Sequence, residues 1–455
     1  MSIHFRHFAY RLTLGLSFAA ISFAVAATKP AAEFLTSEST LSNGLKVIIR
    51  EDHRAPIVMT QIWYKVGSSD ESGNTLGISH VLEHLMFKGT NKVPNDEFTR
   101  LSRLYGGKIN ASTFTNYTTY YQLYPKAYFP LALELEADRM HNLKLQQQDF
   151  ETEIRVVMEE RRQRIEDNPR ALAFERFKWI SYPTSHYRQP IIGHLKTLQT
   201  INLADLKTWY KQWYQPNNAI LVIVGDVETQ SALHQVQKYF GDINSARLNT
   251  RNDVTEFPAI GYRHQEIHTN VHIPNLYLAW NTVSLKTAAQ PTDALALVIL
   301  AALLDKGISS RLEQNLVRKN QILSSVSVSY DPYNRGDSLF SISALPHQQV
   351  SLHDAQQAIL NEIESIKYQG VTQQELDRVV KQYIAQHIYN QDDLSNQAQM
   401  IGNLEVNGLS FRWIDELPKQ LRKLDSKEIQ RVAQQYLSRS RLSSLFILPE
   451  STAVK

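Results

Sequence analysis

Cysteine is absent from this chain of 455 residues. Disulfide bonds and thiolate metal ligands are therefore excluded, which leaves histidine and carboxylates as the strong ligands for a transition metal. An excess of charge is also missing, because 48 basic residues face 45 acidic residues and the formal net charge is +3. Such a chain gives no electrostatic reason to expect nucleic acid or a membrane surface as a partner. With 43% hydrophobic residues, its length supports real cores in more than one domain.

An apolar run at the N-terminus has the features of an export signal. Arg6 and Arg11 lead into an apolar segment at residues 12–25, and residues 24–26 offer a small-residue cleavage site. The run is too short to favour a permanent membrane span, so we predict that residues 1–26 are a signal peptide, with retention as an anchor as the alternative. Its removal takes away two arginines and no acids, so the net charge falls from +3 to +1. Export without disulfides is compatible with the bacterial periplasm.

The most informative segment is His80-Val81-Leu82-Glu83-His84, which holds two imidazoles and a carboxylate. Apolar residues at helical spacing flank it, which predicts a buried amphipathic helix. His80 and His84 then stand one turn apart on the same face, where two neutral imidazoles can bind one zinc ion. Glu83 lies near enough to act as general base on a water beside that ion. The alternative is a pair of core histidines beside a glutamate that faces solvent.

A catalytic zinc site needs a third protein ligand, and an acidic segment downstream offers candidates. We predict a helix that Asp149 caps at its N-terminus and that Pro169 ends. Glu153 and Glu160 are seven residues apart in the sequence, so two helical turns bring them to nearly the same side. One of them can therefore bind the metal while the other acts at longer range.

These motifs resemble those of the pitrilysin family of zinc peptidases, the inverzincins. In that family the H-x-x-E-H motif is followed, about 75 residues later, by a glutamate ligand, with a supporting glutamate seven residues before it. Here Glu160 lies 76 residues after His84, and Glu153 stands seven before Glu160. The resemblance therefore implies that Glu160 is the third ligand and that Glu153 supports the site. Glu159 fits the distance almost as well and stays the alternative, although no acid stands seven residues before it.

A further block of the family pattern lies between these helices. Residues 105–115 contain two glycines and then threonine and aromatic residues, which predict a turn that opens into β-strands. The resemblance implies that Asn110, Ala111 and Ser112 belong to an edge strand beside the metal. Substrate would add to this edge as another strand through main-chain hydrogen bonds. The alternative is an ordinary hairpin of the sheet.

The expected elements recur in the same order in the two halves of the chain. An apolar helix is expected at residues 293–304, and strands are expected at residues 45–49, 58–66, 220–224, 276–280, 324–330, 338–345 and 442–448. This repetition predicts an α+β fold of two homologous domains, which the resemblance implies to be half of a clamshell. We place the metal-binding domain at residues 27–250 and an inactive counterpart, which lacks the motif, at residues 251–455. The polar segment at residues 244–253 is the expected linker.

The resemblance implies a zinc-dependent endopeptidase that holds one zinc ion per chain and cuts peptides or unfolded segments within an enclosed chamber. A homologous second subunit would supply the facing half of that chamber. Family members hold substrate with an arginine and a tyrosine seven residues apart, and these places fall near Phe340 and His347. Their absence favours a heterodimer over a homodimer. The competing hypothesis is a non-catalytic assembly subunit or peptide-binding scaffold, which usually has a damaged metal motif. No nucleic acid partner and no stable membrane span after signal removal are expected.

Overall fold

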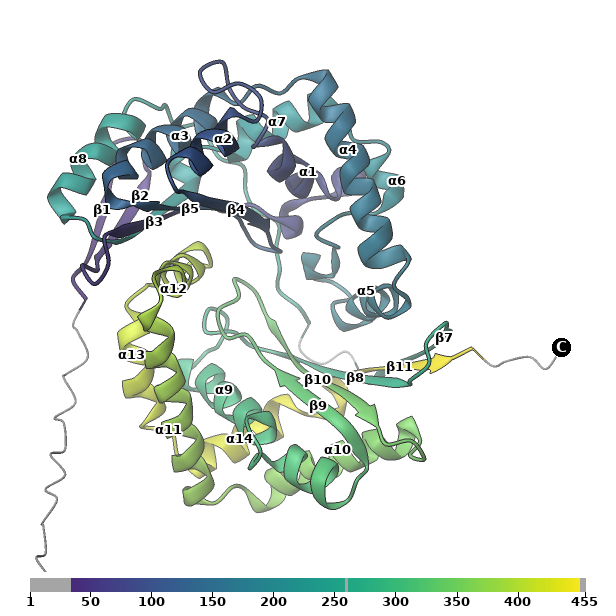
Figure 1. The fold of residues 1–455 in the computed structure, drawn as a ribbon. Helices are drawn as coiled ribbons and strands as arrows, with labels where there is room; N and C mark the ends of the chain where they lie inside the picture. The colour runs from purple at the N-terminus through teal and green to yellow at the C-terminus, as the bar shows by residue number, and fades with distance from the viewer. Residues whose placement is uncertain (1–33, 258–260, 451–455) are drawn as a thin grey trace, which may run out of the picture. The chain divides into compact units, whose positions relative to one another are not determined.

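The computed structural model describes residues 34–257 and 261–450, so the predicted signal peptide at residues 1–26 lies outside the described residues. The described residues from Leu35 onward belong to one compact unit. This unit consists of two β-sheets with helices packed on them, which confirms the predicted α+β class (Figure 1). None of the described helices combines the length and the apolar character that crossing a membrane requires.

The first sheet has six strands in the order β1-β2-β6-β3-β5-β4. Neighbouring strands are antiparallel except for the parallel pair β2 and β6. β6 is buried along its whole length, because both faces of the sheet are covered at this strand. β4 forms one edge of the sheet, and among the described strands it pairs with β5 alone. The bounds are β1 (Thr36–Thr40), β2 (Lys46–Glu51), β3 (Ile57–Tyr64), β4 (Lys108–Thr113), β5 (Thr118–Pro125) and β6 (Ala219–Gly225).

The second sheet repeats this pairing with five strands in the order β7-β11-β8-β10-β9. Its parallel pair, β7 and β11, occupies the place of β2 and β6, and its other pairs are antiparallel. The expected repetition of one α+β unit is therefore visible in the sheets, while the exact domain boundaries stay a prediction. The bounds are β7 (Arg263–Thr269), β8 (Asn275–Thr282), β9 (Leu323–Ser329), β10 (Ser338–Pro346) and β11 (Leu442–Pro449).

Helices of the first half cover one face of the first sheet (Figure 1). The predicted acidic helix is present as α4, but its N-terminus was placed wrongly. It begins at Gln147, which puts Asp149 in the first turn and not at the cap, and Pro169 starts the next helix, where a missing N–H costs nothing. The bounds are α1 (Ile78–Leu85), α2 (Glu97–Leu104), α3 (Phe129–Asn142), α4 (Gln147–Arg161), α5 (Pro169–Ser181), α6 (Leu195–Leu198), α7 (Leu203–Trp213) and α8 (Thr229–Phe240).

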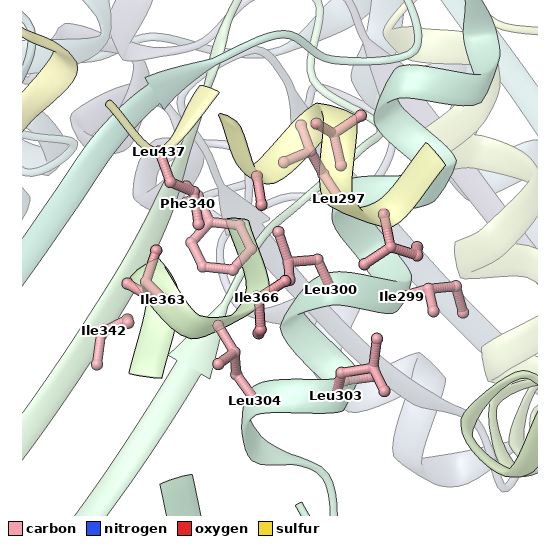
Figure 2. Close-up of a cluster of buried hydrophobic side chains, with 14 of the residues drawn as sticks. Leu297, Ile299, Leu300, Leu303, Leu304, Phe340, Ile342, Ile363, Ile366 and Leu437 are labelled. Atoms are coloured by element: carbon pink, nitrogen blue, oxygen red, sulfur yellow. The ribbon is translucent and has the colours of Figure 1, made fainter. Parts of the chain in front are cut away.

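The second half has its own apolar core between its sheet and the helices on it. Leu297, Leu300 and Leu304 of α9 pack there against β10 and α10 (Figure 2). Phe340 of β10 is fully buried in this core, and the places expected near Phe340 and His347 for a substrate-holding arginine and tyrosine stay a prediction. The bounds are α9 (Pro291–Asp305), α10 (Leu352–Gln369), α11 (Gln373–Tyr389), α12 (Leu394–Val406), α13 (Trp413–Leu421) and α14 (Ser426–Tyr436).

One helix of each half packs on the sheet of the other half. α12 packs on β3 and β6 of the first sheet, and there Gly402 lies so close to Trp63 that an added Cβ would come within 2.0 Å of the indole ring. α5 packs on β7, β8 and β11 of the second sheet. The linker predicted at residues 244–253 has no helix or strand, yet its Arg251 is held by two hydrogen bonds to Asp70. These contacts fix the two halves against each other.

Candidate active site

The H-x-x-E-H motif lies on α1, as predicted. Val81, Leu82 and Leu85 are buried in the core of the first half, which leaves His80 and His84 on the flank that faces a cavity. At the N-terminus of this helix, the buried carboxylate of Glu71 accepts hydrogen bonds from the backbone N–H groups of Gly77 and Ser79, at 2.6 and 2.9 Å. This carboxylate satisfies donors that the helix itself leaves unpaired and so fixes the position from which both histidines project.

His80, His84 and Glu160 converge from two helices. Their potential ligand atoms all lie within 4.8 Å of one another. One carboxylate oxygen of Glu160 is 3.9 Å from Nε2 of His80 and 3.5 Å from Nε2 of His84. A tetrahedral zinc ion with ligands at about 2.0–2.1 Å separates its ligand atoms by about 3.3 Å, so the two distances from Glu160 lie within about 0.6 Å of the separation that a bound ion requires. The residues present therefore fit a zinc ion, with two nitrogens and one carboxylate oxygen as donors.

Glu153 supports this group from two helical turns before Glu160 on α4. Its carboxylate lies 3.0 Å from Nδ1 of His84, and its other oxygen lies 2.8 Å from Nζ of Lys88. The hydrogen bond with His84 and the charge of Lys88 keep the pKa of Glu153 below its usual range. An ionised Glu153 accepts the Nδ1–H of His84, and this leaves Nε2 of that ring with its lone pair toward Glu160.

Glu83 lies on the same helix but takes no part in the three-ligand group. Its carboxylate accepts a hydrogen bond of 2.5 Å from the hydroxyl of Thr113 at the end of β4. Burial raises the pKa of Glu83, and this brings the carboxyl closer to the range in which it can both take and return a proton near neutral pH. The side chain also lines the cavity beside the two histidines.

The two acidic candidates for a third ligand differ clearly in position. The side chain of Glu159 is 54% exposed and pairs with Arg162 at 3.1 Å. The side chain of Glu160 is 17% exposed, faces both histidines, and also contacts Arg164 at 2.7 Å. Only Glu160 of these two lies beside the imidazoles, while its role as the third ligand stays a prediction.

The charges around the imidazoles favour a cation between them. Burial, together with the neighbouring His84 and Arg164, lowers the pKa of His80 to about 3, so its ring stays neutral and able to donate a lone pair. Burial alone would also lower the pKa of His84, but the hydrogen bond to Glu153 and the charges of Glu83 and Glu160 outweigh it and raise that pKa overall. The same negative field would attract a divalent ion.

The predicted substrate strand is present as the edge strand β4. Asn110, Ala111 and Ser112 all lie on it and line the same cavity as His80 and Glu83. The backbone of β4 pairs with β5 on one side, and α1 lies against it. The structure thus brings the sequence-predicted site residues to one cavity except for Glu153, which contacts Nδ1 of His84, and the roles of all these residues stay predictions.

Sequence reasoning missed four residues of this site: Glu71, Lys88, Thr113 and Lys178. Glu71 affects the site only by binding the N-terminus of α1, and Lys88 only by pairing with Glu153. No rule of sequence spacing connects either residue with the ligands. Thr113 closes the substrate strand, so its place beside α1 could have been suspected from the predicted hairpin. Lys178 belongs to a helix that the motif analysis did not consider.

Comparison with known proteins identifies the family. The family described as Insulinase (Peptidase family M16) matches residues 46–194, and the Peptidase M16 inactive domain matches residues 200–383. The Zinc protease PqqE of Helicobacter pylori is 30% identical over 448 residues, which cover 98% of this chain and 100% of that protein. A probable mitochondrial-processing peptidase subunit beta of Arabidopsis thaliana is 25% identical, over 88% of this chain and 76% of its own length.

Solved structures agree with this assignment. A protease from Helicobacter pylori shares the fold with a TM-score of 0.84 and 28% identity, over 91% of this chain and 100% of that chain. The first half of the periplasmic protease PqqL from Escherichia coli has the same fold, with a TM-score of 0.78 and 18% identity, over 91% of this chain and 92% of that one. The resemblance drawn from the motifs is thereby confirmed, and the chain belongs to peptidase family M16.

Proposed function

We propose that this chain is a zinc-dependent endopeptidase with one zinc ion bound by His80, His84 and Glu160. The observation that carries the proposal is the convergence of these three ligand atoms within 4.8 Å beside the edge strand β4. The intact ligand set argues against a non-catalytic scaffold, for which nothing requires two imidazoles and a carboxylate at this separation. Relatives named zinc proteases support the same metal.

A bound zinc ion would supply Lewis acidity, which polarises a peptide carbonyl and lowers the pKa of an attacking water. Glu83 takes a proton from that water and later passes it to the leaving amine. The hydroxyl of Thr113 holds one oxygen of Glu83 and leaves the other free to move the proton. Glu153 holds the ring of His84 in the tautomer with the proton on Nδ1, in which Nε2 has a lone pair available for a metal ion.

The open edge of β4 explains how one site can accept many sequences. An extended peptide that adds to this edge is held by main-chain hydrogen bonds, which do not depend on its side chains. Asn110 and Ser112 line the cavity from the same strand, so the bound peptide would run beside Glu83 and the two histidines. We therefore propose unfolded segments and peptides as substrates, because a folded protein does not offer a free extended strand.

Chelation tests the proposed activity. The tagged protein, isolated from its own cells with any associated subunit, is expected to carry one zinc ion per chain and to cut a mixture of unfolded peptides at internal bonds. Removal of zinc by a chelator should abolish cleavage, and added zinc should restore it. Metal analysis and mass spectrometry of the products provide the measurement. Absence of bound zinc together with uncut peptides would support the scaffold instead.

We also propose that a second, homologous chain completes an enclosed chamber around this site. The structural match to the full periplasmic protease PqqL covers 93% of this chain but only 48% of PqqL. The fold of this chain therefore matches about half of a longer chain. Neither Leu339 nor Ser341, the neighbours of buried Phe340 in β10, is an arginine or tyrosine, and His347 follows the strand as an exposed histidine. The substrate-holding pair expected from the family would then come from the partner.

Expression of the chain alone tests this partner. The isolated chain is expected to have a kcat/KM at least tenfold below that of the complex taken from cells, because the substrate-holding pair of the partner would be missing. Mass spectrometry of the complex should show a second chain of similar length. Full activity from a homogeneous preparation of this chain would instead establish a self-sufficient homodimer or monomer.

Export to the bacterial periplasm is a further proposal, and it rests on the leader pattern at residues 1–26 and on the absence of cysteine. The N-terminal sequence of the mature protein after cell fractionation tests it. A cytoplasmic protein that retains residues 1–26 would contradict it.

A further inference from the structure

The cavity beside the three-ligand group extends well beyond the residues that would hold zinc. It has a volume of about 710 Å³, enough for several substrate side chains. α1, α4 and β4 provide one wall, which carries the ligands and Glu83. α5 and the segment that follows it also line the cavity, through Phe174, Lys178 and Ile191. None of these three residues has a role in the proposed chemistry.

Among the described charged residues that line this cavity, Lys178 differs in having no hydrogen-bond or ion-pair partner. Glu175 accepts hydrogen bonds from the two terminal guanidinium nitrogens of Arg161, at 2.6 and 2.9 Å. Arg164 pairs with Glu160 at 2.7 Å. Within the part of the chain that the structure describes, the ammonium group of Lys178 makes neither a hydrogen bond nor an ion pair. The cavity therefore contains one cationic group whose charge no protein group balances directly.

The surroundings of Lys178 make its unbalanced positive charge unfavourable when no ligand is bound. Burial lowers the pKa of Lys178 to about 8, although the charge of Glu175 opposes the shift. Glu175 acts on Lys178 only through its charge, because its hydrogen bonds go to Arg161 and it forms no ion pair with Lys178 among the described residues. A partly desolvated ammonium group gains most from a carboxylate that enters the cavity and replaces the lost water. Phe174 and Ile191 line the same cavity with apolar side chains, which offer no hydrogen-bond acceptor to that ammonium group.

We propose that Lys178 is a specificity residue that binds a carboxylate of the substrate on the α5 side of the cavity. The proposal rests on the proposed peptidase function and adds a substrate class to it: unfolded peptides that carry an acidic group within a few residues of the cleaved bond. The carboxylate can come from an aspartate or glutamate side chain or from a free C-terminus, since both present the same charge and the same acceptor oxygens. The adjoining apolar wall favours an apolar neighbour of that acidic group.

Matched peptides test this specificity. One series shares a cleavable core and carries aspartate or asparagine at each position on either side of the cut bond. A second series has neutral side chains and ends in either a free carboxylate or an amide. In the complex isolated from cells, the charged member of at least one pair should be cut with a kcat/KM tenfold or more above its neutral partner, as expected for a hydrogen bond between charged groups. The series that responds identifies the source of the carboxylate.

Variants of Lys178 assign the effect to this residue. In Lys178→Met, the charged-to-neutral ratio of kcat/KM should fall to about one, and in Lys178→Glu it should fall below one. Lys207→Met is the matched control, because Lys207 is an exposed residue of α7 outside the cavity and its loss should leave the ratio unchanged. Zinc content and thermal unfolding show whether each variant retains its fold. An unchanged ratio in Lys178→Met, or equal rates for every wild-type pair, would overturn the proposal.

A binding measurement separates this inference from the proposed function. The same peptide pairs, labelled with a fluorophore, are titrated with the Glu83→Gln protein, which should bind without cutting. Tighter binding of the charged peptide, lost in the double variant with Lys178→Met, supports the carboxylate site even if wild-type protein cuts nothing. Equal binding of charged and neutral peptides, together with normal cleavage, contradicts the carboxylate site alone and leaves the peptidase assignment intact.

Discussion

Replacement of Glu83 by glutamine is expected to lower kcat by 10²–10⁴-fold or more, because general-base catalysis alone contributes about this factor. Glutamine keeps the size of the side chain, and its carbonyl oxygen can still accept the hydrogen bond from Thr113. It cannot take a proton from the attacking water or return one to the leaving amine. Glu83 does not belong to the group of three ligand atoms, so the zinc content should stay at one ion per chain.

Steady-state cleavage of a defined peptide and metal analysis of the same preparation provide the two measurements. Glu159→Gln is the matched control: Glu159 also lies near the site in sequence, but its side chain is exposed and pairs only with residues of its own helical segment. This control should retain both turnover and zinc. Normal turnover in Glu83→Gln would remove Glu83 from the mechanism, whereas loss of zinc in that variant would make it a ligand.

The central helix of the site could be predicted from the sequence because its pattern is local. His80, Glu83 and His84 lie within five residues, and their flanking apolar residues fix both the helix and the face that is buried. The strands with apolar patterns were predicted close to their observed bounds for the same reason, as β6 and β10 illustrate. The repeated order of elements then indicated two related α+β units, which the matching order of pairing in the two sheets bears out.

Elements without an apolar pattern were missed. β1 and β7 are strands of largely polar sequence at the edges of their sheets, where one or both faces are not covered by a core. The start of α4 was placed wrongly because Asp149 is equally suited to a first turn and to a cap. Such boundaries depend on which backbone donors find a partner, and this is decided by tertiary contacts.

Long-range contacts account for what else the sequence did not reveal. Glu71 stabilises α1 across a loop, and Lys178 reaches the cavity from a helix that packs mainly on the second sheet. The packing of α5 on the second sheet and of α12 on the first sheet is also a long-range contact. The sequence of neither helix shows which sheet that helix covers. These contacts join residues by folding and not by spacing, so a single sequence without relatives contains no pattern that reports them.

The proposed third ligand, Glu160, lies between features that sequence spacing predicts and features that only long-range contacts decide. Its substitution is expected to give the second large effect. Glu160→Gln should weaken zinc binding by far more than Glu153→Gln, for which the loss should be about 10–100-fold, as is typical when a group that orients a ligand is removed. The reason is geometric: a carboxylate oxygen of Glu160 lies 3.5 Å from Nε2 of His84, whereas Glu153 contacts only the far nitrogen of that ring. An amide in place of Glu160 also removes the negative charge that balances the ion.

Competition with a chelating dye measures the zinc affinity of the wild type and of the three variants Glu160→Gln, Glu153→Gln and Glu159→Gln under identical conditions. Glu159→Gln is expected to match the wild type, because its side chain is 54% exposed and bonds with Arg162 instead of the imidazoles. Thermal unfolding of each metal-free variant shows whether a loss of affinity reflects a loss of fold. Weak zinc binding in Glu159→Gln beside normal binding in Glu160→Gln would mean that α4 turns by one residue when the ion binds, and it would transfer the ligand role to Glu159.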